Sequence, residues 1–210
     1  MAYRAVIFDL GGVVFPSPFE SFDAYDHDNG LEPGTVRSLI RASSESGTWA
    51  ALERGELSMH AFVDALEAEA LAAGFPLDAR RLMASIGASL GPRPEMARAI
   101  ACIRSSGLRT AALTNNWSDE TRQPTPNGLH GAGLFDVIVE SAVVGLRKPD
   151  PRIYALALAR LNVLASEAVF LDDLGMNLKP AREMGMATIK VVDPGAALDA
   201  LESMLGFALR

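Results

Sequence analysis

The sequence predicts an α/β protein in which a doubly wound parallel sheet carries an inserted helical unit. Short apolar runs rich in β-branched residues are typical of strands buried on both faces of such a sheet. Four runs of this kind and one further candidate occur at residues 4–10, 109–114, 168–171 and 187–192, and at residues 135–139. The long stretch between the first two runs contains no convincing strand and is rich in helix formers.

Helical patterns separate the predicted strands. Apolar residues recur at helical spacing in residues 94–106, 151–161, 178–184 and 196–205. Strands that alternate with helices of this length form βαβ units, and right-handed crossovers place the helices on both faces of one sheet. We therefore expect these segments to form a single doubly wound core.

Residues 16–91 predict a separate helical unit inserted after the first strand. Ser58 has the chemistry of a helix N-cap and precedes a run of strong helix formers. A structureless connection of this length is rare in a compact protein. We therefore expect a core formed by residues 1–15 and 92–210, and a helical cap formed by residues 16–91.

The composition of the chain indicates which partners and which cellular compartment to expect. The 210 residues suffice for one substantial core with a smaller unit attached. A net charge of −7 disfavours nucleic acid and anionic membranes as partners, and no apolar run is long enough to span a membrane. Cys102 is the only cysteine, which excludes an intramolecular disulfide and, without an apolar leader, favours the cytoplasm. The oligomeric state stays open.

Polar side chains follow the predicted strands, at the edge where open α/β sheets bind ligands. They are Asp9 at the end of the first run, Thr114 at the end of the second with Asn115 and Asn116 after it, Lys148 in the loop after residues 135–139, and Asp172 and Asp173 after the run at 168–171. Carboxylates from different strands repel each other unless a cation lies between them, and oxygen ligands suit Mg²⁺. With such a cation in place, one carboxylate can attack a small phosphorylated substrate at phosphorus.

Four of these segments resemble the sequence motifs of the haloacid dehalogenase superfamily, in order and spacing: FDLGGVV, LTNNW, RKPDPRIY and FLDDLGMN. Within it, the chain is similar to the phosphatase domain of soluble epoxide hydrolase and to the hydrolase-like domain of multidomain acyl-CoA dehydrogenases. The resemblance spans nearly the whole predicted core. It implies a Rossmann-like core, a helical cap that selects the substrate, Mg²⁺ as cofactor, and hydrolysis of a phosphate monoester through an aspartyl-phosphate.

The resemblance also implies a role for each matched residue. Asp9 would be the nucleophile and Lys148 the catalytic cation. The metal would be bound by Asp9, Asp173 and the carbonyl of Gly11, with Asp172 and Asn177 just behind these ligands. The phosphate would be bound by Thr114, Asn115 and Asn116.

Gly11 departs from the family's pattern. Most phosphatases of the superfamily carry an aspartate there as general acid and base, a role worth roughly 10²–10⁴-fold in rate. Two other interpretations of the chain stay open. One is a metal-independent dehalogenase, which the paired carboxylates disfavour because a metal-free site gains nothing from clustered negative charge. The other is a catalytically weak binding module in which Gly11 marks the loss of activity.

Overall fold

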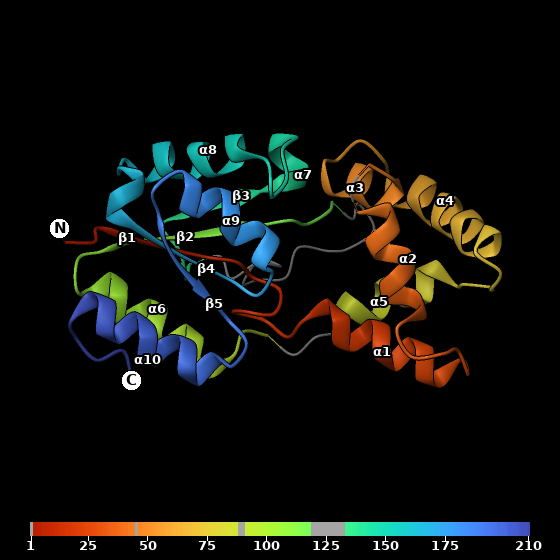
Figure 1. Cartoon of the computed structure of the whole chain (residues 1–210), viewed down its shortest axis with the longest axis horizontal. Helices are drawn as coiled ribbons and strands as arrows, with labels where there is room; N and C mark the ends of the chain where they lie inside the picture. The colour runs from red at the N-terminus through yellow and green to blue at the C-terminus, as the bar shows by residue number, and fades with distance from the viewer. Residues whose placement is uncertain (1, 45, 88–90, 119–132) are drawn as a thin grey trace.

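The central feature of the fold is a five-stranded parallel sheet with the strand order β3-β2-β1-β4-β5 (Figure 1). The computed structural model describes residues 2–44, 46–87, 91–118 and 133–210. The strands are β1 (Ala5–Phe8), β2 (Arg109–Thr114), β3 (Val137–Glu140), β4 (Ala168–Asp172) and β5 (Ala187–Lys190). The predicted α/β class and the parallel sheet are confirmed.

Strand β1 lies at the centre of the sheet because it pairs with both β2 and β4. Phe8, its last residue, is in register with Ala112 of β2 and Leu171 of β4. The amide of Asp9 donates a hydrogen bond to the carbonyl of Leu171 at 2.8 Å and extends the pairing by one residue. The carboxyl ends of the three strands therefore deliver their next residues to the same edge.

Helices cover both faces of the sheet (Figure 1). Helices α8 (Pro151–Leu161) and α9 (Gly175–Glu183) pack on one face, and α6 (Pro94–Ser105) and α10 (Pro194–Leu205) pack on the other. The two short helical segments α7 (Ser141–Val144) and η1 (Ala165–Glu167) flank β3 and β4. Ile7 of β1 faces α8 and α9, whereas Phe8 faces the opposite helices, as the alternation of side chains along a strand requires.

The segment after β1 contains five helices among its described residues and has a hydrophobic core of its own. Its helices are α1 (Pro18–Asp28), α2 (Thr35–Ser43), α3 (Thr48–Glu53), α4 (Met59–Ala72) and α5 (Ala79–Gly87). Phe22, Trp49, Phe62 and Leu66 lie at the centre of that core. The hydroxyl of Ser58 accepts a hydrogen bond from the amide of Ala61, so the predicted N-cap of α4 is confirmed.

Strands β3 and β5, like β1, do not cover the whole apolar run that predicts them. β3 begins at Val137 because Phe135 packs beneath the sheet instead, with its ring 6.1 Å from that of Phe8. β5 ends at Lys190, and Val192 is 84% exposed. An apolar residue next to a strand in the sequence therefore does not always take part in the hydrogen-bond pairing of that strand. No helix within the described ranges is both long and apolar enough to cross a membrane.

Candidate active site

A buried lysine joins two carboxylates at the carboxyl end of the sheet. The Nζ atom of Lys148 lies 2.7 Å from Oδ1 of Asp9 and 2.7 Å from Oδ2 of Asp172. Lys148 is 1% exposed and Asp172 is fully buried. An isolated buried charge is strongly unfavourable, so these three side chains stabilise one another as a set. The structure thus brings together Asp9 after β1, Asp172 from β4 and Lys148 from the loop before α8.

A third carboxylate, that of Asp173, completes the cluster. One oxygen from each of Asp9, Asp172 and Asp173 lies within 4.8 Å of the other two. Gly12 makes the approach possible, because a Cβ atom there would lie 2.3 Å from Oδ2 of Asp173. Its φ of 79° also favours glycine. The loop after β1 is therefore built to lie directly against Asp173.

The electrostatics of the cluster show an excess of negative charge. Burial raises the pKa of Asp9 to about 8, with Asp172 and Asp173 acting in the same direction and Lys148 opposing them. Burial, followed by the charge of Asp172, raises the pKa of Asp173 to about 6. Burial alone would lower the pKa of Lys148, but Asp172 and Asp9 raise it above its usual value. One ammonium does not neutralise three carboxylates, and a divalent cation would relieve the repulsion.

The raised pKa values predict that the metal-free protein becomes less stable as the pH rises from about 4 to about 8. In this window the folded state keeps protons on Asp9 and Asp173 that the unfolded state has released, so a rise in pH favours unfolding. A Mg²⁺ ion bound to the cluster, as the resemblance implies, should raise the Tm more at about pH 8 than at about pH 5, because fewer protons need to be displaced. Thermal unfolding with Mg²⁺ or EDTA at both pH values measures this difference. An equal Mg²⁺ effect at both would contradict it, and Asp173→Asn should reduce the pH dependence.

Asp172 is fully engaged by its neighbours. Its Oδ1 accepts hydrogen bonds from the amide of Leu174 at 2.8 Å and from Nδ2 of Asn177 at 3.1 Å, and its Oδ2 accepts from Lys148 and Asn177. Tyr154 donates its hydroxyl to the carbonyl of Asn177 at 2.8 Å and holds that residue in turn. Asp172 and Asn177 therefore lie together behind the lysine, where they fix its ammonium group.

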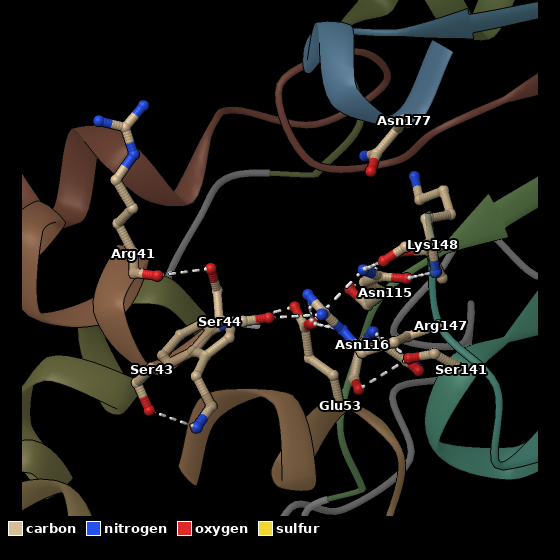
Figure 2. Close-up of polar contacts among 12 residues, drawn as sticks. Arg41, Ser43, Ser44, Glu53, Asn115, Asn116, Ser141, Arg147, Lys148 and Asn177 are labelled. Atoms are coloured by element: carbon tan, nitrogen blue, oxygen red, sulfur yellow. Dashed lines mark hydrogen bonds and ion pairs between the residues drawn. The ribbon is translucent and has the colours of Figure 1, made fainter. Parts of the chain in front are cut away.

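Asn115 holds the backbone of Lys148 on both sides (Figure 2). Its Oδ1 accepts from the Lys148 amide at 2.8 Å, and its Nδ2 donates to the Lys148 carbonyl at 3.0 Å. The side chain of Asn116 is directed to α7 and β3, where Nδ2 donates to Glu140 at 2.8 Å. Thr114 ends β2 and is 4% exposed. Phosphate binding by these three residues stays a prediction, and the two amide side chains are already committed to protein partners.

Glu53 and Arg147 form a largely buried ion pair that the sequence does not predict. The Nε and Nη2 atoms of Arg147 both lie 2.6 Å from Oε2 of Glu53, and Nη1 donates to the carbonyl of Ser44 at 2.5 Å (Figure 2). The Oε1 atom of Glu53 accepts from Nε1 of Trp49 at 3.0 Å. Burial raises the pKa of Glu53, and Arg147 opposes the rise. Because 94 positions separate the pair and charged helix residues are usually solvated, no local signal indicated it.

Gly11 does not have the positive φ angle of its neighbour Gly12. A Cβ atom at Gly11 would lie 3.3 Å from Cδ of Pro18, a tight contact with one side chain. Within the described ranges, the Gly11 carbonyl accepts no hydrogen bond. The backbone conformation at this position therefore does not require glycine, and no described backbone amide donates to its carbonyl oxygen.

A parallel α/β sheet with a helical insertion after β1, and a lysine among carboxylates at the strand ends, defines a hydrolase of the haloacid dehalogenase type. Residues 3–185 match the family model of haloacid dehalogenase-like hydrolases. The chain belongs to this family, as its sequence motifs predict.

Known proteins of this type resemble the whole chain. It is 40% identical to acyl-CoA dehydrogenase family member 10 of Mus musculus, across 99% of the chain and 20% of that protein. It is 34% identical to bifunctional epoxide hydrolase 2 of Sus scrofa, across 100% of the chain and 40% of that protein. The chain thus spans less than half the length of either relative. A solved HAD family enzyme of Bacteroides thetaiotaomicron, in complex with magnesium and inorganic phosphate, shares the fold with a TM-score of 0.62 at 18% identity, over 90% of this chain and 94% of that one.

Proposed function

We propose that the chain is a Mg²⁺-dependent phosphatase that hydrolyses a small phosphate monoester through an aspartyl-phosphate on Asp9. The observation that carries the proposal is the charge imbalance at the strand ends, where one buried ammonium faces three carboxylates. Such a cluster suits a divalent cation and, with it, an anionic phosphate group. A dehalogenase that works without metal would gain nothing from the third carboxylate.

The donor set fits Mg²⁺. Asp9 and Asp173 offer carboxylate oxygens, and Gly11 offers a carbonyl oxygen from the loop after β1. Oxygen-only ligands are those that Mg²⁺ prefers in proteins. When bound, the ion supplies positive charge that neutralises phosphoryl oxygens. The magnesium and phosphate in the similar Bacteroides thetaiotaomicron enzyme support this assignment.

Asp9 is the nucleophile in the proposed reaction. Its carboxylate attacks phosphorus, the ester oxygen leaves with the electrons of the P–O bond, and water then hydrolyses the acyl-phosphate to release inorganic phosphate. Lys148, held by Asp172, places its charge beside Asp9 and against the phosphoryl oxygens. The Thr114 hydroxyl, at the end of the neighbouring strand β2, hydrogen-bonds the phosphoryl group. Gly11 has no side chain with which to protonate the leaving oxygen.

The cap in this proposal comprises residues 16–91, and its helices follow directly from the strand that carries Asp9. A cap that closes over the strand ends excludes bulk water from the reaction and selects the substrate. The substrate is accordingly a small phosphate ester that fits beneath the helices. A single cysteine supports a reducing compartment, and we place the activity in the cytoplasm.

Removal of the metal should abolish the proposed activity. Hydrolysis of an aryl phosphate should fall to background in EDTA and return with added Mg²⁺. Asp173→Ala should lower turnover by about 10²-fold or more even with Mg²⁺, because the ion loses a protein ligand. Asp64→Ala is the matched control, since this aspartate lies on α4 with a side chain that is 67% exposed.

Full activity in EDTA would contradict the phosphatase proposal. A simultaneous release of halide from a 2-haloacid would then favour the dehalogenase interpretation. Phosphate binding without turnover across a panel of esters would instead favour the weak binding module.

A further inference from the structure

We propose that Glu53 is a positioning residue that couples the docking of the helical unit to the placement of Lys148. The inference rests on the proposed function for its catalytic measurement. Its structural basis is independent, because it consists of contacts between α3 and the loop that carries the lysine. Arg147 and Asn115 are the two residues through which Glu53 acts.

Helix α3 contacts the core through the carboxylate of Glu53. The Oε2 atom of Glu53 lies 2.6 Å from both Nε and Nη2 of Arg147, and Nδ2 of Asn115 donates to it at 3.4 Å (Figure 2). One carboxylate oxygen therefore meets two core residues that are far apart in the sequence. Arg147 directly precedes Lys148 in the chain, and the side chain of Asn115 forms hydrogen bonds with the Lys148 backbone.

Asn115 connects Glu53 to the backbone of Lys148 and so to its ammonium group. Asn115 forms hydrogen bonds with both the amide and the carbonyl of Lys148, so a shift of its side chain moves that backbone. Nζ of Lys148 then lies 2.7 Å from both Asp9 and Asp172. A continuous series of contacts therefore links the carboxylate of Glu53, through Asn115 and the Lys148 backbone, to the ammonium group beside Asp9.

The contact between Glu53 and Arg147 is largely buried. The side chains of Glu53 and Arg147 are 9% and 14% exposed, so both charges are largely shielded from bulk water while α3 is docked. Gly55, just after α3, lies so close to the core that a Cβ atom there would be 2.5 Å from the carbonyl oxygen of Ala142. Helix α3 is therefore seated against the core, and undocking would expose a buried ion pair.

Glu53 is not a substitute for the general acid that Gly11 lacks. Its Oε1 accepts from Trp49, and its Oε2 accepts from Arg147 and Asn115. All three partners donate, so neither oxygen of Glu53 has an acceptor here to which it could pass a proton. Its effect on the reaction therefore passes through the position of Lys148.

Glu53→Gln keeps the shape of the side chain and removes its charge. We expect this variant to lower kcat by about ten- to a hundredfold while KM changes by less than about threefold, because a displaced orienting group mainly affects the reaction step. Glu56→Gln is the matched control, since Glu56 lies in the same segment, pairs with Arg54 at 2.6 Å and has a side chain that is 53% exposed. Equal kcat values for the two variants and the wild type would overturn the proposal.

A second variant separates positioning from stability. Glu53→Gln leaves the charge of Arg147 buried without its partner and should lower the Tm, whereas Glu53→Gln with Arg147→Met removes both charges and should recover it. Positioning predicts that the double variant regains stability but stays slow. If kcat recovers together with the Tm, the pair is only structural and the inference fails.

A third measurement needs no turnover. Trp49 of α3 and Trp117 after β2 are the only tryptophans, and their rings are 5.9 Å apart. Acrylamide quenching of their fluorescence therefore reports the contact between the helical unit and the core, and it should increase in Glu53→Gln but not in Glu56→Gln. If the wild type hydrolyses no phosphate ester, the proposed function fails, and this measurement still tests the docking contact. Equal quenching in both variants would overturn that contact.

Discussion

Replacing Asp9 by asparagine should lower the hydrolysis of an aryl phosphate by at least about 10³-fold, because an amide oxygen is a poor nucleophile toward phosphorus. The fold should survive the change. The Oδ1 atom of Asp9 accepts from the Leu10 amide at 2.7 Å and from Lys148 at 2.7 Å, and the oxygen of an asparagine can accept both bonds. Because its raised pKa of about 8 already keeps Asp9 mostly protonated in the metal-free protein, the substitution changes little charge at neutral pH and we expect no loss of Tm.

Two measurements complete the test of the nucleophile. Beryllium fluoride with Mg²⁺ imitates an acyl-phosphate, so it should stabilise the wild type against thermal unfolding and leave Asp9→Asn unaffected. Asp64→Asn, on the exposed side of α4, controls for purification and for the chemical change itself. If Asp9→Asn keeps more than a few per cent of the wild-type rate while Asp64→Asn behaves as wild type, another group performs the attack.

The sequence indicated the sheet and the charged cluster because both depend on local patterns. β1 and β4 are buried along their whole length, so their apolar runs were visible without knowledge of the fold. A parallel sheet also dictates that its strands end at one edge, so Asp9 and Asp172 could be placed together from the order of the elements.

Contacts between the helical unit and the core could not be predicted in the same way. Glu53 and Arg147 each look like ordinary solvated charges, and only the packing of α3 on the core brings them together. The role of Asn115 was hidden for a related reason. Its position at a strand end is compatible with phosphate binding, but its side-chain amide is used to hold the Lys148 backbone.

Restoring a carboxyl group at Gly11 should speed the hydrolysis of alkyl phosphates by up to roughly 10²–10⁴-fold, the range typical of general acid catalysis. An alkoxide is a poor leaving group and needs a proton as its bond to phosphorus breaks. An aryloxide leaves with less assistance. The wild type should therefore favour aryl esters, and Gly11→Asp should improve alkyl esters selectively.

The backbone conformation at Gly11 is compatible with an aspartate. Gly11 does not adopt the left-handed conformation, so an aspartate there does not strain the backbone. A new Cβ atom would lie 3.3 Å from Cδ of Pro18, so the start of α1 has to move by a few tenths of an ångström to make room for it. Gly12→Asp is the contrasting variant. There φ is 79° and the Cβ atom would lie 2.3 Å from Asp173, so this variant should lose both stability and activity.

The dependence of rate on the pKa of the leaving group measures the effect of the new carboxyl group. A site without a general acid lets negative charge build up on the leaving oxygen, so log kcat/KM for the wild type should fall steeply as the leaving-group pKa rises. Gly11→Asp should flatten that slope, because proton transfer to the oxygen cancels the charge as it forms. The gain should also disappear at high pH, where the new carboxyl group can no longer enter the reaction protonated. Equal and shallow slopes for the two proteins would contradict the prediction, and would mean that another group already supplies the proton and that Gly11 is not a catalytic deficit.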